Sequence, residues 1–217
     1  MTSPGKSSDR LRRCRYASHM LALRPNCEQC GTDLPPDSDD ARICSFECTF
    51  CRECATWEFL GICPNCGGEL VTRPRRPITK LEASAASAEI VRKEHDLGAH
   101  QRRVLERLAA GDLPEQTWVV SFANERLPND TGYAETAEHM DSLASEQPGF
   151  LGVDSVRGDG GAGITVSRWS SIAALVAWRR LGPHAEARGR GRSEWYASYR
   201  SDVARVDRTA EFRHTPG

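Results

Sequence analysis

The second half of the chain switches between two hydrophobic periods. Residues 117–125 alternate large apolar side chains with smaller ones, a period of two that predicts a strand with one buried face. Apolar residues then recur at helical spacing through residues 133–144, until Gln147-Pro148-Gly149 ends the predicted helix. Residues 150–158 and 161–170 have the pattern of two further strands, and the glycines between them favour a hairpin.

A second helix and a last strand complete this pattern. Apolar residues over 172–178 share one helical face, which ends near Gly182-Pro183. A short helical piece over residues 186–199 precedes a strand around residues 203–206. The order strand, helix, strand, strand, helix, strand is that of the ferredoxin-like fold. We therefore expect an α+β domain over residues 114–212, with helices on one face of its sheet.

The other face of this sheet would be left uncovered, and a monomer rarely exposes a large apolar patch. We therefore expect a homodimer formed through the C-terminal domain. The apolar residues assigned to the uncovered face are Trp118, Val120, Phe122, Val153, Ile164 and Val166.

The pattern upstream of the domain is weaker. Thr79-Lys80-Leu81-Glu82 has the form of a capping box, and apolar residues recur at roughly helical spacing to about Ala110. We expect one long helix, or two helices separated at Gly98, as a helical linker over residues 78–113.

Both ends of the chain lack hydrophobic periodicity. Residues 1–19 are polar and basic, which is typical of a disordered leader, and Met20 is an alternative start to Met1. Residues 213–217 form a tail. Nothing in the first twenty residues has the apolar run of a signal peptide, so we expect a cytoplasmic protein. No stretch reaches the roughly 18 apolar residues of a membrane span.

The cysteines divide the chain in two. Eight of the nine lie between Cys27 and Cys66, whereas the ninth, Cys14, has no assigned role. A segment of about forty residues rarely buries enough apolar surface to fold unaided. Because a cytoplasmic chain keeps its thiols reduced, metal is a better stabiliser here than disulfides. We therefore expect a metal-binding module over residues 20–77.

The spacing of these cysteines predicts two structural zinc ions per chain, each bound by four thiolates. Four thiolates leave no open position for water, which argues against catalytic zinc; an iron–sulfur cluster is the alternative. Pairing along the sequence would give one site from residues 27, 30, 44 and 48 and another from 51, 54, 63 and 66. Interleaved pairing would instead give Cys27, Cys30, Cys51 and Cys54 on one ion, and Cys44, Cys48, Cys63 and Cys66 on the other.

The spacing resembles that of a RING finger, including the proline in Cys63-Pro64-Asn65-Cys66, and this resemblance favours interleaved, cross-braced pairing. A RING also has an apolar residue between its first two ligands to grip a ubiquitin-conjugating enzyme, whereas this chain has Glu28-Gln29 there. Ubiquitin ligase activity therefore ranks low. The segment LRPNCEQCGTDLPPDSDDARICSFECTFCRECA…CPNCGGEL is more closely similar to a small bacterial cysteine-rich family with no established activity.

The formal net charge of −1 gives no general argument for a nucleic-acid partner. Eight thiolates with two zinc ions would add negative charge that this count omits. We therefore interpret the nearby arginines as charge compensation and expect no nucleic acid to bind. These arginines are Arg24, Arg42, Arg52, Arg73, Arg75 and Arg76.

The C-terminal domain resembles the antibiotic biosynthesis monooxygenase family. The resemblance is carried by GYAETAEHMDSLASEQPGFLGVDSVRGDGGAGITVSRWSSIAALVAW, followed by His184 and GRSEWYASY. It implies a ferredoxin-like fold paired into a dimeric α/β barrel, with an apolar cavity between helices and sheet. Some members oxygenate aromatic polyketide quinols without metal or flavin, others open haem, and many have no demonstrated activity.

This resemblance singles out Asn124, Trp178 and His184 as candidate catalytic residues, with Trp169 as a further cavity residue. Haem-opening relatives use an Asn, a Trp and a His in similar elements, but His184 comes early after the tryptophan and follows Gly182-Pro183, which argues against haem ligation. Each candidate also has a structural interpretation. The tryptophans suit a core, His184 suits a helix end, and Asn124 suits a backbone hydrogen bond.

The leading interpretation is a zinc module joined to a monooxygenase-like domain that oxygenates a small aromatic or quinol substrate without a cofactor. The alternative is a non-enzymatic dimer that binds haem or an aromatic ligand. In that case the zinc module would be a docking surface for a protein partner.

Overall fold

The computed structural model describes residues 20–158 and 160–214. The expected leader, Cys14 and the end of the tail lie outside these residues. The cysteine-rich part is built on a small antiparallel sheet of order β2-β1-β3, with one helical turn, η1, between β2 and β3 in the sequence. Its buried centre combines the cysteines with Leu34, Phe50, Phe59 and Leu70. The elements are β1 (Ala41–Ile43), β2 (Thr49–Cys51), η1 (Cys54–Glu58) and β3 (Val71–Thr72).

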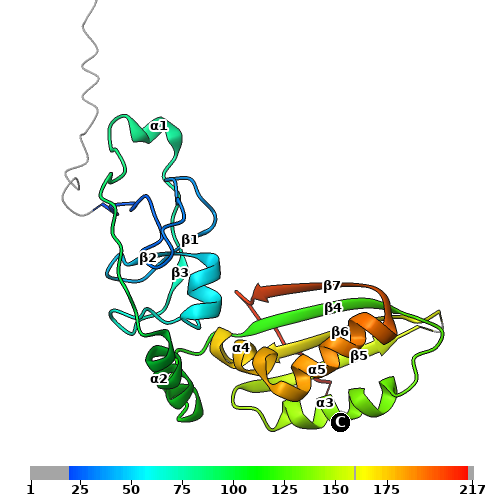
Figure 1. The fold of residues 1–217 in the computed structure, drawn as a ribbon. Coiled ribbons are helices and arrows are strands. Elements are labelled where there is room, and N and C mark those ends of the chain that lie inside the picture. The colour runs from blue at the N-terminus through cyan, green and yellow to red at the C-terminus, as the bar shows by residue number, and fades with distance from the viewer. Residues whose placement is uncertain (1–19, 159, 215–217) are drawn as a thin grey trace, which may run out of the picture.

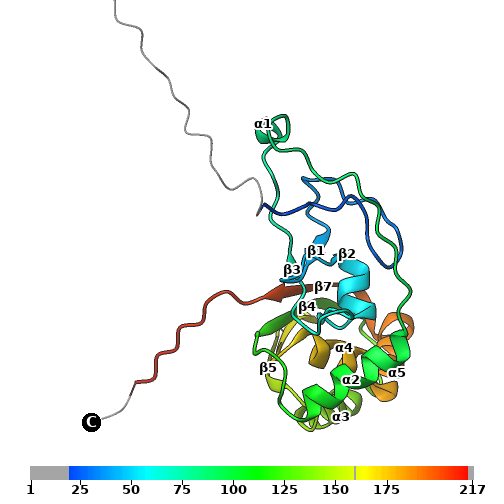
Figure 2. The same ribbon diagram turned by 90° about the vertical axis from the view of Figure 1, so that its left-hand side faces the viewer.

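The linker differs from the helix that its sequence predicts. Only α1 (Ile78–Leu81) and α2 (Leu97–Ala109) are helical, and the capping-box residues give α1 no side-chain cap. Between them the chain runs the length of the cysteine-rich part (Figures 1 and 2). We call residues 85–95 the strap.

Hydrogen bonds to a distant segment explain why the alanine-rich strap is not helical. The Asn26 side chain donates to the carbonyl of Val91 (2.8 Å) and accepts from its amide (3.2 Å). The Lys93 amide donates to the Glu28 carbonyl at 2.9 Å. These contacts outweigh helix propensity, which is a weak preference per residue.

Helix α2 begins where the strap ends. Asp96 caps it by accepting a hydrogen bond from the Ala99 amide at 2.9 Å. Gly98 therefore falls in the first turn instead of separating two helices. Gly111, with a φ of 70°, follows the end of the helix as expected.

The C-terminal half has the predicted order of elements and forms a four-stranded antiparallel sheet of order β5-β6-β4-β7. Helices lie on one face of it (Figure 1). This arrangement confirms the ferredoxin-like fold. The elements are β4 (Trp118–Arg126), α3 (Tyr133–Ser145), β5 (Phe150–Arg157), β6 (Ala162–Trp169), α4 (Ile172–Arg180), α5 (Gly182–Arg190), η2 (Gly191–Trp195) and β7 (Tyr196–Arg205).

The last strand is longer than its sequence predicts. Residues 196–199, expected to be helical, belong to β7, because β4 pairs with that strand from Arg126↔Tyr196 to Trp118↔Arg205. Long-range pairing again overrides the local pattern.

The expected composition of the uncovered sheet face is wrong for Val120, Phe122 and Val153, which line a cavity on the helix side of the sheet. Trp118 also packs against a buried core instead. Side chains alternate along a strand, so Ile164 and Val166 do belong to the outer face, opposite Thr165. The most exposed apolar residues there are Leu151, Val156 and Ile164, at 54%, 70% and 47%.

One buried cluster joins the two halves of the protein. Leu60 and Ile62, from the cysteine-rich half, pack with Val104 and Leu108 of α2 and with the buried face of α4. At this junction Gly61 has a φ of +78°, and a Cβ atom there would lie 2.3 Å from Ile172 Cγ2. Glycine is needed for both reasons. None of the helices in the described residues is long and apolar enough to cross a membrane.

Candidate metal centres and aromatic cavity

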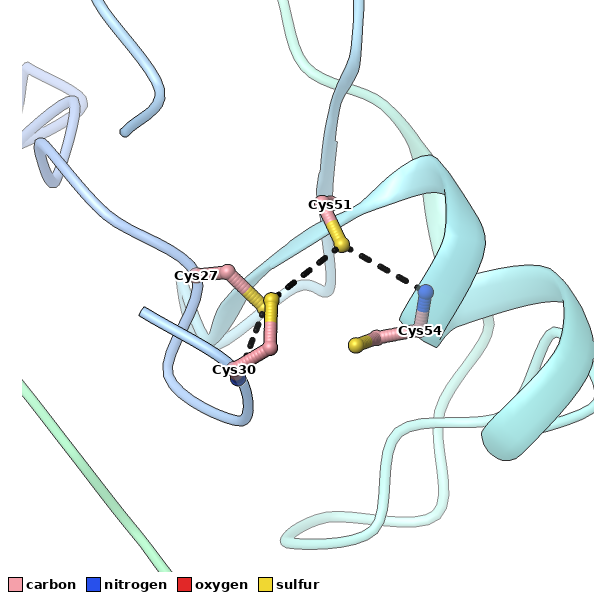
Figure 3. Close-up of side chains that lie close together, drawn as sticks. All are labelled: Cys27, Cys30, Cys51 and Cys54. Atoms are coloured by element: carbon pink, nitrogen blue, oxygen red, sulfur yellow. Dashed lines mark hydrogen bonds between the residues drawn. The ribbon is translucent and has the colours of Figure 1, made fainter. Parts of the chain in front are cut away.

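The first cysteine cluster draws its sulfurs from two separate turns. Cys27 and Cys30 come from the turn before the small sheet, whereas Cys51 ends β2 and Cys54 begins η1. All four sulfurs lie within 4.8 Å of one another (Figure 3). The Cys30 amide points at Cys27 Sγ (3.5 Å) and the Cys54 amide at Cys51 Sγ (3.4 Å). Amides in these positions stabilise thiolate charge.

The second cluster contains Cys44, Cys48 and Cys63, again within 4.8 Å of one another. The Cys66 thiol interacts with those of Cys63 and Cys44. This grouping confirms the interleaved arrangement and excludes pairing along the sequence.

The chemistry of the first cluster suits a metal cation. The neighbouring Cys54 thiol lowers the pKa of Cys27 to about 4, whereas burial raises the pKa of Cys51 to about 11. The four close sulfurs thus favour one thiolate but disfavour the negative charge of a second one. A divalent cation would neutralise this repulsion. Four sulfurs in a compact group are typical of zinc or an iron–sulfur cluster. Each cluster could hold a metal ion.

Glu28, between the first two cysteines, is fully buried and not a surface contact. Its carboxylate pairs with Arg24 and Lys93 and accepts from the Thr49 amide at 2.8 Å. Within the described residues, none of the hydrogen bonds made by the nearby arginines reaches a cysteine sulfur. Arg73, for example, donates to the carbonyls of Arg24, Leu34 and Pro35.

A cavity of about 570 Å³ lies between the sheet and helices α3, α4 and α5. Nine of its 27 lining residues are aromatic. The aromatic residues that line it are Trp57, Phe122, Tyr133, Phe150, Trp169, Trp178, Trp195, Tyr196 and Tyr199.

Planar side chains stack along one wall. Trp178 lies on the fully buried Trp169 with 5.8 Å between ring centroids and 25° between planes. His184 also stacks on Trp178, with 4.3 Å between ring centroids and 15° between planes. Leu181, with a ψ of 128°, separates α4 from α5 and lets the chain turn so that His184 can reach Trp178.

Two family models match the chain. Residues 20–76 match a protein family of unknown function, DUF1272, and residues 129–190 match the antibiotic biosynthesis monooxygenase (ABM) family. The uncharacterized protein YqjZ of Bacillus subtilis (strain 168) is 53% identical over 96 residues, which are 44% of this chain and 84% of YqjZ. The uncharacterized protein R02474 of Rhizobium meliloti (strain 1021) is 62% identical over 74 residues, 34% of this chain and 88% of R02474.

The chain therefore belongs to both families. It joins an N-terminal DUF1272 module to a C-terminal ABM domain. Among solved structures, SnoaB, a cofactor-independent oxygenase from Streptomyces nogalater, is similar at 10% identity with a TM-score of 0.38, covering 44% of this chain and 96% of SnoaB.

The surroundings of His184 in the ABM domain fix its protonation state. Burial, together with the charges of Arg188 and Arg179, lowers the pKa of His184 to about 4. Its Nδ1 lies 3.0 Å from the Trp178 carbonyl, which can only accept a hydrogen bond. Nδ1 therefore carries the hydrogen, and Nε2 is left as a hydrogen-bond acceptor in a neutral ring.

The ABM cavity is positively charged. Arg179, Arg188 and Arg192 line it, and within the described residues none of them forms an ion pair with a carboxylate. Asp141 is the one acidic residue among the lining residues. Burial raises the pKa of Tyr196, so its hydroxyl stays protonated.

Asn124 does not line the cavity. It is buried on β4, where its Oδ1 accepts from Arg157 Nη2 at 3.1 Å, and the same guanidinium nitrogen donates to the Tyr133 hydroxyl at 3.1 Å. Tyr133 does line the cavity, so Asn124 is connected to the cavity by these hydrogen bonds through Arg157. The Asn124 Nδ2 has no hydrogen-bond partner among the described residues.

The sequence did not identify Tyr133, Trp195, Tyr196, Trp57 or Arg179 as site residues. All five line the cavity. Trp57 had no usable signal, because it lies in the DUF1272 module, far from the ABM domain in sequence.

Proposed function

We propose that the ABM domain binds a small planar phenol or quinol as its anion and oxygenates it without a cofactor. The observation that carries this proposal is the aromatic cavity with neutral His184 stacked on Trp178 and unpaired arginines around it. Aromatic walls suit a flat ring, and the arginines suit negative charge on it.

In this chemistry the phenolate itself supplies the electrons for reduction of oxygen. One O₂ is consumed per substrate; one oxygen atom enters the ring to give a quinone, and the other leaves with two hydrogens as water. The protein then has to deprotonate the phenol, orient the ring and exclude water.

His184 is the base in this proposal, through Nε2. With a pKa of about 4 it is a weak base toward an ordinary phenol. The arginine charges favour the phenolate and so lower the pKa of the bound phenol. The bound anion in turn favours the imidazolium and so raises the pKa of His184.

We also propose that the DUF1272 module holds two structural zinc ions, one per cluster, with Cys66 completing the second. Zinc would join turns that are far apart in sequence, which suits a module with a small apolar centre. The amides directed at the sulfurs of Cys27 and Cys51 support this assignment.

We further propose a homodimer formed through the outer sheet face. The support is apolar exposure at Leu151, Val156 and Ile164 on neighbouring strands.

The alternative is a dimer that binds an aromatic ligand or haem without turning it over, with the DUF1272 module as a protein-docking surface. The low pKa of His184 and the position of Asn124 outside the cavity favour this alternative.

Absorbance titration with haemin and with a panel of quinols, followed by oxygen uptake, separates these functions. Quinol binding with one O₂ consumed per substrate, and with one oxygen atom of that O₂ retained in the quinone, would support the oxygenase. Saturable binding without oxygen uptake would support the ligand-binding protein, and no binding at all would contradict both.

A further inference from the structure

The DUF1272 module supplies one wall of the ABM cavity. Trp57 belongs to η1 of that module, yet its half-buried side chain lines the cavity together with Trp178 and His184. The guanidinium of Arg179, another lining residue, lies over the Trp57 ring with 4.9 Å from Cζ to the centroid. Such a contact orients both groups.

Hydrogen bonds from helices α4 and α2 hold the Trp57 segment in place. Arg180 Nη2 donates to the Trp57 carbonyl at 2.6 Å, and Arg180 Nη1 donates to Gln101 Oε1 at 3.1 Å. Gln101, on α2, donates in turn to the Glu58 carbonyl at 2.9 Å. The Phe59 carbonyl accepts from His100 Nε2 at 3.0 Å.

The same segment is held by the first cysteine cluster at its other end. Helix η1 begins at Cys54, and Trp57 follows three residues later. One turn of helix does not persist alone, because few of its residues share a hydrogen bond. The position of Trp57 therefore depends on Cys54 being fixed.

We propose that Trp57 contacts the aromatic ligand of the ABM domain, so that metal in the first cysteine cluster raises the affinity of the cavity for that ligand. This inference rests on the proposed binding of an aromatic anion, but not on its oxygenation. Because coupling between two binding events is reciprocal, the ligand also raises the affinity of the cluster for metal.

The test measures binding of 1-hydroxy-2-naphthoate, a fluorescent phenol with an anionic group, to the full chain under reducing conditions. Trp57→Ala is expected to weaken binding about tenfold, the usual size of a lost aromatic contact, and Trp57→Phe to retain most of the affinity. Phe46→Ala is the matched control, because Phe46 is an exposed aromatic of the same module that does not line the cavity. It should bind as the wild type does.

Metal removal by a chelator should weaken binding to the wild type by a similar factor. Where circular dichroism shows that the ABM domain stays folded without metal, removal should weaken binding to Trp57→Ala much less than binding to the wild type, because both changes remove the Trp57 contact. Arg180→Gln cuts the bond to the Trp57 carbonyl while sparing the cysteines and the cavity lining. Arg180→Gln should therefore also weaken binding, and it tests the inference even if Trp57→Ala does not fold.

Equal affinity of wild type, Trp57→Ala and Arg180→Gln with metal bound would overturn the inference. A wild-type protein that does not bind the probe, or one whose binding is unaffected by Trp178→Ala, would instead overturn the proposed cavity function. The two failures are therefore distinct.

Discussion

At the scale of single residues, the surroundings of His184 decide what chemistry it can perform. The sequence places a histidine just after a helix break, where a solvated cap and a buried base are equally reasonable. Burial against Trp178 and the nearby arginines keep the ring neutral, with its Nδ1 hydrogen engaged by a carbonyl. These contacts come from residues on either side of the break, and no local pattern encodes them.

If His184 is the base, His184→Ala should lower turnover of a quinol by about a hundredfold or more, the usual contribution of general-base catalysis. His184→Phe is the companion variant, because it keeps a ring on Trp178 without the proton acceptor. Oxygen uptake measures turnover, and quinol titration measures binding. Wild-type turnover in either variant would remove His184 from the mechanism.

The pKa of His184 also predicts how stability depends on pH. The ring binds a proton in the unfolded chain below its ordinary pKa of about 6.5, but in the folded protein only below about 4. The unfolded state therefore binds more protons in this interval, and stability should fall as the pH drops from about 6.5 to 4. Urea titrations across this range should show a smaller loss for His184→Gln than for the wild type.

The cysteines illustrate the opposite case at the same scale. Their spacing and the RING resemblance were enough to predict the grouping, because each pair lies in a short turn whose geometry is local. Trp57 and Arg179 could not be found this way. Trp57 belongs to the DUF1272 module and Arg179 to the ABM domain, and only the folded chain brings them together.

At the scale of elements, strands were predicted better than the linker. Alternation along β4, β5 and β6 is a local property of half-buried strands, and the structure has all three. The strap was predicted wrongly as helix because its conformation depends on Asn26, more than sixty residues away. The length of β7 likewise depends on its pairing with β4.

Asn26→Ala should therefore release the strap. The variant loses both hydrogen bonds to Val91 and leaves backbone groups without partners, which typically costs about 1–3 kcal/mol. Faster amide hydrogen exchange over residues 85–95 would report the release. Asn129→Ala is the control, because that exposed side chain bonds only to Thr131 within the described residues. Unchanged exchange in Asn26→Ala would mean that other contacts hold the strap.

At the scale of the whole molecule, metal content is the most direct test of the DUF1272 module. Elemental analysis of the reduced protein should give two zinc per chain. Chelation should unfold the part packed around Phe50 and Phe59 and should lower the stability of the ABM domain, because Leu60 and Ile62 leave its core. Circular dichroism and calorimetry follow these changes. One metal per chain, or iron in place of zinc, would contradict the proposal.

Association is the second test at this scale. Light scattering at micromolar concentration should give about twice 24.0 kDa. Val156→Glu combined with Ile164→Glu should give a monomer, because it buries charge in the proposed interface. Ile90→Glu, at a similarly exposed position on the strap, should leave the dimer intact. A wild-type monomer would show that the outer sheet face has no partner in solution.

The apolar junction at Gly61 has a consequence for expressing either half of the chain alone. Leu60 and Ile62 lie against α2 and α4, and the backbone between them passes so close to Ile172 that no side chain fits. A DUF1272 module expressed alone would expose the apolar side chains of Leu60 and Ile62 to water. The ABM domain expressed alone would likewise expose the residues of α4 that pack on them, so each half should be less soluble than the full chain.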